Sequence, residues 1–281
     1  MTERILTEEK IEAFQLYLIS EEKSKNTVEK YMRDVRTFAG RIGEKNITKS
    51  EVLAYKTSLI AENYAPRSIN SMLASLNSLF SFLGWLDCKV KSLRIQRQIY
   101  CAEKKELTRA EYERLVRAAQ KRGNERLALL LQTICSTGIR VSELSFITVA
   151  SAKCGEVEIT LKGKSRRILL PKALQQKLLS YSRKKGIKSG PIFLTRSGRP
   201  LSRSNIWREM KKLCADAQVD PNKVFPHNLR HLFARIFYGI KRDIAKLADV
   251  LGHSSIETTR IYVVSTGSEH RRYLDSMRLL L

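Results

Sequence analysis

The segment of residues 226–263 most restricts how this chain folds, because its apolar residues recur at the spacing of a helix. The apolar stripe consists of Leu229, Phe233, Ile236, Phe237 and Ile240. Such a stripe predicts a helix with one face packed on a core. His227 and Arg230 are three residues apart, so they share a face of that helix.

A glycine and a second helix start follow in the same segment. We expect a helix over Lys246–Leu251 that ends at Gly252, which places His253 in the turn. Residues 254 and 257 are a Ser and a Glu at capping-box spacing, so another helix begins there. Tyr262 then lies two turns into it. Each residue alone is typical of an ordinary core or surface, but together they predict a site.

An arginine follows a second glycine earlier in the chain. Residues 127–134 are strongly apolar and predict a buried helix that stops at Gly138. Arg140 then lies at the start of the next helix, where backbone N–H groups and the helix dipole favour an anion. A guanidinium fork beside them suits a phosphate. Glu143 is expected to brace this helix.

A basic hairpin is predicted downstream. Residues 156–160 and 167–170 have strand character, and Gly163 marks the turn in the loop between them. Lys162 and Lys164 flank that glycine. The tip would contact phosphates, with or without a chemical role.

The N-terminal part predicts a small helical bundle. Its helices are expected at 8–19, 27–42 and 51–62, and from Pro66 to about Leu83. The fourth helix has a polar face that contacts either a sugar–phosphate backbone or water: Ser68, Asn70, Ser71, Ser75 and Asn77. We therefore predict a helical domain over 1–88, a basic linker over 89–105 that crosses DNA or forms a solvated hinge, and a second domain over 106–281.

The charge of the chain favours a polyanionic partner. Its formal net charge is +24, and residues 1–100 carry 16 Lys and Arg against 12 Asp and Glu. The remaining residues carry 36 against 16, so the second domain holds most of the excess. Nucleic acid is the first candidate for such a partner. No apolar run is long enough for a membrane span, and the five scattered cysteines indicate a reducing cytoplasm.

Two motifs resemble the conserved boxes of the tyrosine recombinase (phage integrase) family. The first is Thr-Gly-Ile-Arg-Val-Ser-Glu-Leu at 137–144, and the second is His-Asn-Leu-Arg-His, Leu-Gly-His and Thr-Arg-Ile-Tyr within 227–262. The resemblance implies a mainly α fold with a small antiparallel β-sheet. It also implies a SAM-like core-binding domain followed by a mixed α/β catalytic domain of the DNA breaking-rejoining type.

The resemblance assigns roles to six residues: Arg140, Lys162, His227, Arg230, His253 and Tyr262. Tyr262 would be the nucleophile, and the two arginines would stabilise the charge that develops on the phosphate. His227 would assist proton transfer and His253 would bind the phosphate. Lys162 would protonate the leaving oxygen, although Lys164 is an alternative. His231 is expected to point elsewhere and to be structural.

The resemblance implies a site-specific DNA recombinase that works through a 3′-phosphotyrosyl intermediate without metal, ATP or cofactor. Its expected partner is double-stranded DNA with short inverted-repeat core sites. Integration or excision of a mobile element is the predicted role, with Xer-type dimer resolution or DNA inversion as alternatives. A type IB topoisomerase and a non-catalytic DNA-binding regulator on the same scaffold are the other candidates.

The last residues predict an assembly contact. A helix over 269–281 with an apolar side is expected to dock on a neighbouring copy, giving a homotetramer on two duplexes. The protein is expected in the cytoplasm, associated with the nucleoid.

Overall fold

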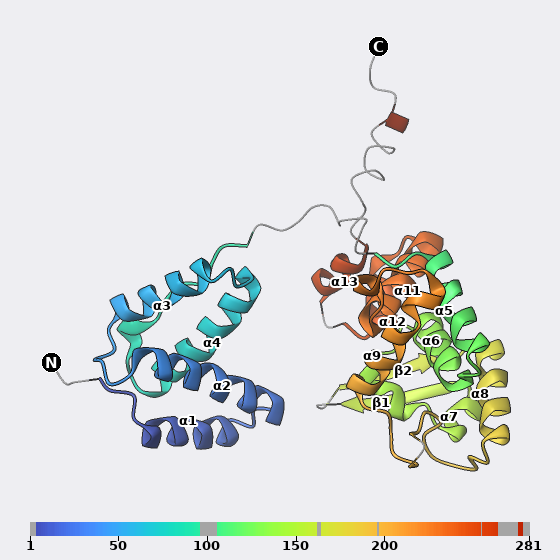
Figure 1. The fold of residues 1–281 in the computed structure, drawn as a ribbon, viewed down its shortest axis with the longest axis horizontal. Coiled ribbons are helices and arrows are strands. Elements are labelled where there is room, and N and C mark those ends of the chain that lie inside the picture. Colours follow the sequence, from blue (N-terminus) through green and yellow to red (C-terminus); the bar gives the residue numbers. More distant parts are fainter. Residues whose placement is uncertain are drawn as a thin grey trace. The chain divides into compact units, whose positions relative to one another are not determined.

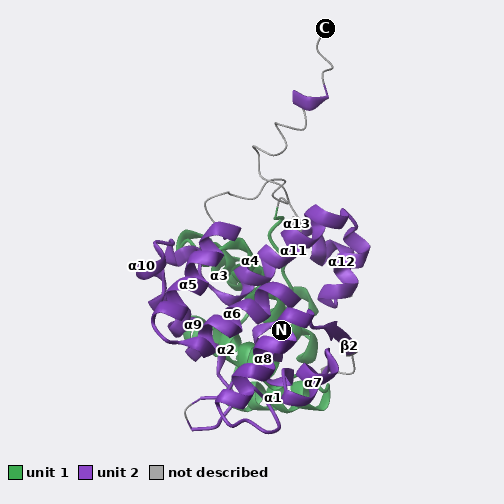
Figure 2. Cartoon of the chain, turned by 90° about the vertical axis from the view of Figure 1, so that its right-hand side faces the viewer, with its two compact units in different colours: residues 1–97 green, residues 98–281 purple. Residues whose placement is uncertain are grey.

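The structure is a computed structural model that describes residues 4–95, 106–161, 164–195, 197–253, 255–263 and 275–277. The chain divides into two compact units, residues 1–97 and residues 98–281 (Figure 2). The fold is mainly helical with one small antiparallel sheet, as the sequence predicts (Figure 1). Within the described ranges no helix has the length and apolar character needed to cross a membrane.

Unit 1 is a bundle of helices close to the predicted bounds. They are α1 (Glu8–Ser20), α2 (Lys25–Ile42), α3 (Lys49–Ala61) and α4 (Pro66–Phe82), followed by the 3-10 turn η1 (Leu86–Cys88). The hydroxyls of Thr7, Ser24 and Thr48 cap the first three helices by accepting backbone N–H groups. Phe14, Phe38 and Phe80 are fully buried and form the centre of the core.

The polar face of α4 binds the chain that leaves the bundle. The Asn77 side chain exchanges hydrogen bonds with the backbone of Val90 at 2.9 and 3.1 Å, and Asn70 does so with Leu93 at 2.9 and 2.7 Å. Ser75 is buried and donates to Asp34 at 2.9 Å. These three side chains therefore have partners within unit 1, and residues 89–93 lie against the bundle.

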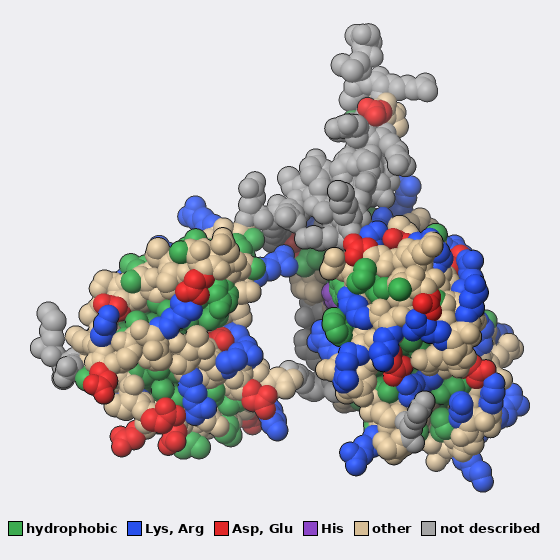
Figure 3. All heavy atoms as spheres, viewed as in Figure 1, with side chains coloured by type: hydrophobic (Ala, Val, Ile, Leu, Met, Phe, Trp, Pro, Cys, Tyr) green, Lys and Arg blue, Asp and Glu red, His purple; other side chains and the backbone are tan. Residues whose placement is uncertain are grey.

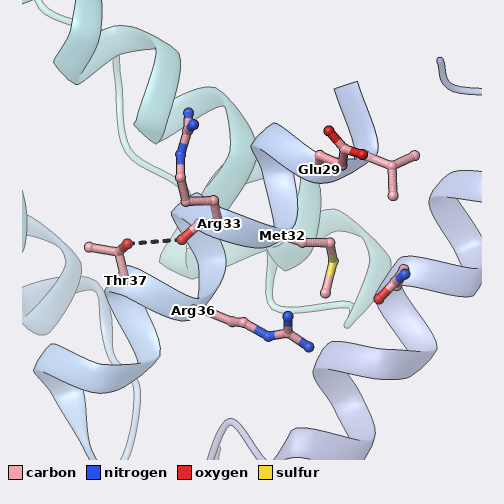
Figure 4. A pocket seen from close by; sticks show the side chains of 7 residues that line it. Glu29, Met32, Arg33, Arg36 and Thr37 are labelled. Atoms are coloured by element: carbon pink, nitrogen blue, oxygen red, sulfur yellow. Dashed lines mark hydrogen bonds between the residues drawn. The ribbon is translucent and has the colours of Figure 1, made fainter. Parts of the chain in front are cut away.

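A surface hollow of about 630 Å³ lies between α1 and α2 in unit 1 (Figure 4). Met32 and Arg36 line it, and the Thr37 hydroxyl beside it donates to the Arg33 carbonyl at 2.9 Å. It contains none of the predicted site residues, so the chemistry must be sought in unit 2.

Unit 2 is built around an apolar central helix. Its N-terminal elements are α5 (Arg109–Lys121), α6 (Glu125–Thr137), η3 (Val141–Phe146) and α7 (Val149–Cys154), then strands β1 (Glu156–Leu161) and β2 (Lys164–Leu169). Next come α8 (Lys172–Lys184), α9 (Arg203–Lys212), α10 (Cys214–Ala217) and η4 (Pro221–Lys223). The last are α11 (Pro226–Lys241), α12 (Ile244–Leu251) and α13 (Ile256–Val263). Helix α6 is buried because α5, α8, α9 and α11 all pack on it (Figure 1).

The connection between the two strands of the hairpin is shorter than the sequence predicts. Strands β1 and β2 pair antiparallel from Glu156 opposite Leu169 to Leu161 opposite Lys164, which leaves a two-residue connection. The prediction of a six-residue loop was wrong because polar residues 164–166 extend β2. Those residues complete the ladder of backbone hydrogen bonds whatever their polarity. The proposed catalytic residue Lys162 lies outside the described residues.

The apolar stripe predicted for α11 is only partly buried. Leu229 is fully buried, and Phe233 and Phe237 pack on a small cluster with Leu247 and Leu251. Ile236 and Ile240 are 38% and 74% exposed, so the prediction was wrong for this end of the helix. The buried residues of α11 end at Ala234, and Ile240 lies beyond them near the end of the helix.

Gly138 ends α6 in the left-handed conformation, with φ of 65°. A Cβ atom placed there would lie 2.5 Å from Cδ1 of Phe233 on α11. The glycine is therefore required by two independent constraints, its backbone conformation and the close approach of α11.

We predict that Gly138→Ala destabilises the protein more than Gly123→Ala. Gly123 is a matched control, because its φ is 67° but no atom would lie within 4 Å of a Cβ at that position. Gly123→Ala should cost about 1–2 kcal/mol from left-handed strain, and Gly138→Ala a further 1–3 kcal/mol from overpacking, about 2–5 in all. Urea unfolding followed by circular dichroism measures both. Equal losses would contradict the contact with Phe233.

Candidate active site

The structure brings five of the six predicted residues together in unit 2. Arg140 precedes η3, His227 and Arg230 lie on the first turns of α11, His253 follows α12, and Tyr262 lies on α13. Helices α11, α12 and α13 lie side by side, which unites these segments (Figure 1). Lys162, the sixth, follows the end of β1 and is not among the described residues.

Arg230 is the most buried of these side chains, with 1% of its surface exposed. Its Nη1 donates to the carbonyl of Gly138 at the end of α6, and its Nη2 donates to the carbonyl of Leu251 at 2.7 Å. Both carbonyls belong to helix C-termini, where the helix dipole favours a cation. Burial, and then the charge of Arg140, lower the pKa of Arg230 to about 10, so it stays protonated at neutral pH.

The tautomer of His253 follows from its two neighbours. Nη2 of Arg230 lies 3.0 Å from Nε2 of His253, and arginine can only donate. Nε2 therefore accepts, and the proton is on Nδ1, which donates to the Thr259 hydroxyl at 2.8 Å. Burial and the charge of Arg230 lower the pKa of His253 to about 4. The imidazole is accordingly neutral at pH 7.

Tyr262 is enclosed by aromatic and cationic groups and is 7% exposed. Its hydroxyl lies 3.5 Å from Nε2 of His227, a distance at the limit of a hydrogen bond. The ring centroid of His253 lies 5.2 Å from that of Tyr262, and Cζ of Arg230 lies 5.9 Å from the phenol ring. The phenol therefore lies beside a histidine ring nitrogen and a buried cation.

His231 belongs to the site, and the prediction that it points elsewhere was wrong. Its ring stacks on Tyr262 with centroids 4.3 Å apart, and it also contacts His227 edge-on at 4.8 Å. Residues 227 and 231 are one helical turn apart, so they share a face of α11. That spacing was the signal in the sequence. Burial, and then the neighbouring His227, lower the pKa of His231.

Arg140 is held by Glu143, as the sequence predicts. The buried Glu143 carboxylate accepts the Arg140 backbone N–H at 2.8 Å and its Nη1 at 3.0 Å. The Arg140 side chain remains 40% exposed. The element after it is a short 3-10 helix rather than an α-helix, so the affinity for an anion rests mainly on the guanidinium.

Arg166 was not among the predicted site residues. Its side chain is 13% exposed and donates both to Glu143 and to the Leu251 carbonyl. It lies on the same face of β2 as the buried Ile168, because residues two apart share a face of a strand. The sequence did contain a signal for this residue, because Arg166 occupies an inward position on the face of β2 that otherwise carries apolar side chains.

The site as a whole carries a positive charge suited to a phosphodiester. Arg140 and Arg166 share one carboxylate, Glu143, while Arg230 donates to backbone carbonyls and contacts His253. Partial burial and the charges of Arg230, Arg203 and Arg140 lower the pKa of His227, which keeps its imidazole able to accept a proton. Within the described parts of the chain, no cluster of three or more His, Cys, Asp or Glu side chains is arranged to hold a metal ion.

This helical fold, with two arginines, histidines and an enclosed tyrosine, defines the class of tyrosine site-specific recombinases. The chain belongs to the phage integrase family. Residues 105–269 match that family's catalytic region, and residues 11–86 match its N-terminal SAM-like domain.

Curated relatives resemble the chain over nearly its whole length. Tyrosine recombinase XerA of Pyrococcus furiosus is 31% identical over 100% of this chain and 98% of its own. Tyrosine recombinase XerD of Halalkalibacterium halodurans is 30% identical over 88% of this chain and 90% of its own.

Solved structures share the fold. A lambda integrase tetramer bound to a Holliday junction has a TM-score of 0.74 at 19% identity, over 92% of this chain and 77% of that one. The XerA recombinase crystal structure has a TM-score of 0.55 at 24% identity, over 98% and 100%. At these identities the likeness concerns the fold alone.

We predict that stability falls as the pH is lowered from about 6.5 toward 4, in part because of His231. Its pKa is lowered in the folded protein, so below about 6.5 the unfolded chain binds the proton more readily. Each such group contributes up to about 1.4 kcal/mol per pH unit in that window. Urea unfolding of wild type and His231→Phe between pH 7 and pH 4.5 measures the difference.

The phenylalanine keeps a stacked ring without a titrating group, and both proteins share an identical unit 1. Stability of the variant should therefore decline less steeply with acid. Parallel pH profiles for the two proteins would contradict the assignment.

Proposed function

We propose that this recombinase cleaves DNA by attack of Tyr262 on a backbone phosphate, leaving a 3′-phosphotyrosine and a free 5′-hydroxyl. The observation that carries the proposal is the Tyr262 hydroxyl, 3.5 Å from Nε2 of His227 and beside the buried Arg230. A non-catalytic binder has no use for a phenol in such surroundings. The regulator alternative is therefore the weaker interpretation.

The proposed step balances as a transesterification. The phenolic oxygen forms a bond to phosphorus while its proton passes to Nε2 of His227, whose lowered pKa keeps it unprotonated beforehand. The guanidinium groups of Arg140 and Arg230 stabilise the charge that develops on the non-bridging oxygens. Lys162 gives a proton to the departing 5′ oxygen. Attack by a 5′-hydroxyl of another strand reverses the step.

The reaction is proposed to need neither metal nor ATP. One phosphoester bond is exchanged for another, so the energy of the broken bond is conserved in the phosphotyrosine. Three arginines around the site supply the positive charge that a metal ion supplies in other phosphoryl-transfer enzymes.

Double-stranded DNA with short inverted-repeat core sites is the proposed partner. Lys and Arg side chains are spread over the visible face of unit 2 (Figure 3). Helix α9 presents Arg203 and Arg208 at the surface, with Trp207 46% exposed between them. These three residues line a shallow hollow of about 350 Å³, and Arg203 acts electrostatically on His227. The exposed face of α9 thus leads from the protein surface toward the site.

We also propose that the protein acts as a homotetramer on two duplexes. The predicted contact is the C-terminal helix 269–281, of which only residues 275–277 are described. The lambda integrase that shares this fold is a tetramer bound to a Holliday junction. That assembly supports the proposal.

The biological event is the least constrained part of the proposal. Integration or excision of a mobile element remains the prediction. The relatives that match along nearly the whole chain are named XerA and XerD, and this favours Xer-type recombination as a second candidate. Because the proposed substrate is DNA, we propose that either activity takes place in the cytoplasm beside the nucleoid.

We predict that Tyr262→Phe binds DNA normally but forms no covalent adduct. Phenylalanine keeps the ring packing and removes only the nucleophilic oxygen. The probe is a duplex selected for binding from a random-sequence pool and nicked in its spacer, so that a cleaved strand cannot rejoin. Denaturing gel electrophoresis detects the protein–DNA band.

Tyr238→Phe is the matched control, since Tyr238 packs against the same small cluster on α11. It should form the adduct at the wild-type rate. An adduct with Tyr262→Phe would assign the nucleophile elsewhere.

We predict that Lys162→Ala slows cleavage by about 10²–10⁴-fold when the leaving group is the 5′ oxygen. A 5′ sulfur leaves without a proton, so the same variant should cleave a sulfur-substituted duplex at nearly the wild-type rate. Lys164→Ala serves as the neighbouring control and should show neither effect. Rescue of Lys164→Ala alone would make Lys164 the general acid.

A further inference from the structure

We propose that Arg166 is a positioning residue. It holds Arg140 and His253, the phosphate-binding half of the site, in their correct relative positions. The inference rests on the proposed function. The evidence is that one guanidinium on β2 contacts the residues that support both groups.

The first contact is with the carboxylate that holds Arg140. Nη2 of Arg166 donates to Oε2 of Glu143, the same oxygen that accepts the Arg140 backbone N–H at 2.8 Å. Glu143 is 2% exposed, so its charge is largely removed from water. Without Arg166, that buried carboxylate would have only the half-exposed Arg140 as a cationic partner, and it would be freer to reorient.

The second contact is with the turn that carries His253. Nη1 of Arg166 donates to the Leu251 carbonyl and lies 3.5 Å from that of Val250. Nη2 of Arg230 donates to the same Leu251 carbonyl at 2.7 Å. Two arginines from different elements therefore meet at the C-terminus of α12, directly before Gly252 and His253.

The contact between Arg166 and the end of α12 requires a glycine at position 252. A Cβ atom at Gly252 would overlap with Cδ of Arg166. The residue also has φ of 63°, in the left-handed region. The glycine therefore leaves room for the Arg166 stem as well as ending the helix.

An arginine is required because its planar fork reaches both partners at once. Lysine carries a single ammonium group and cannot span a carboxylate and a carbonyl in the same fixed geometry. Burial lowers the pKa of Arg166, and the neighbouring Glu143 carboxylate opposes that shift. The position opposite Arg166 on β1 is Ile159, which is buried, so the strand itself is anchored in the core.

The test compares Arg166→Ala, Arg166→Lys and Arg167→Ala in the full chain. Arg167 is a matched control on the same strand, 66% exposed and paired with Glu156 at 3.3 Å. For each variant we would measure the melting temperature, the affinity for one half-site, and the single-turnover cleavage rate with a 5′ oxygen or a 5′ sulfur leaving group. The duplex is the selected, nicked one that wild type cleaves.

Arg166→Ala should cleave about 100-fold more slowly, as expected when a catalytic group is misplaced by about 1 Å. Arg166→Lys should recover less than a tenth of wild-type activity, and Arg167→Ala should stay within about threefold of wild type. Half-site affinity should change by less than about threefold in all variants. The defect of Arg166→Ala should persist with the sulfur duplex, because the phosphate-binding groups and not the leaving-group acid are displaced.

A cycle with Glu143→Gln provides a second test if Arg166→Ala folds poorly. The loss in the pair Arg166→Lys and Glu143→Gln should be smaller than the product of the single losses, because the two side chains act as one unit. The proposal would be overturned if Arg166→Ala cleaved at the wild-type rate, or if the sulfur duplex restored its activity. It would also be overturned if the losses from Arg166→Lys and Glu143→Gln simply multiplied in the double variant. Failure of wild type to form an adduct would instead overturn the proposed function.

Discussion

The buried guanidinium of Arg230 is the interaction on which the catalytic unit depends. It donates to the carbonyls of Gly138, which caps α6, and of Leu251 at the end of α12, and it contacts His253 and Tyr262, so one side chain of α11 links three other helices. Its charge is balanced mainly by carbonyl dipoles at helix ends rather than by a carboxylate of its own. Among the described residues, no carboxylate forms a salt bridge with this guanidinium, which fits the phosphate-binding role proposed for it.

The same arrangement determines the protonation of the histidines. Arg230 fixes the tautomer of His253, and the surrounding arginines and burial lower the pKa of His227, His231 and His253. Of these neutral imidazoles, that of His227 has a ring nitrogen beside the Tyr262 hydroxyl. Because the pKa values of all three fall below the ordinary value for histidine, the neutral form holds at neutral pH and is lost only in acid.

Two hydrogen-bond acceptors and two glycines, far apart in the chain, keep the arginines together. Glu143 receives both Arg140 and Arg166, and the Leu251 carbonyl receives both Arg166 and Arg230. Gly138 and Gly252 permit the close approach of α11 and β2 to these helix ends. Mutual repulsion of the cations is thereby offset within the protein, and the site is preorganised before any DNA binds.

The sequence by itself determined the helices and most of the site, since caps, helix-ending glycines and helical spacing are local properties that a few residues encode. Glu8, Gly138 and Gly252 mark helix ends where the structure has them, and the spacing of His227, Arg230 and Tyr262 carries the resemblance that implies their roles. Only the tertiary structure decided that His231 stacks on Tyr262, that Arg166 bridges Glu143 and α12, and that Asn70 and Asn77 bind the chain leaving unit 1. These contacts join segments up to 85 residues apart, and which partners meet depends on how the packed helices are arranged, which no local pattern specifies.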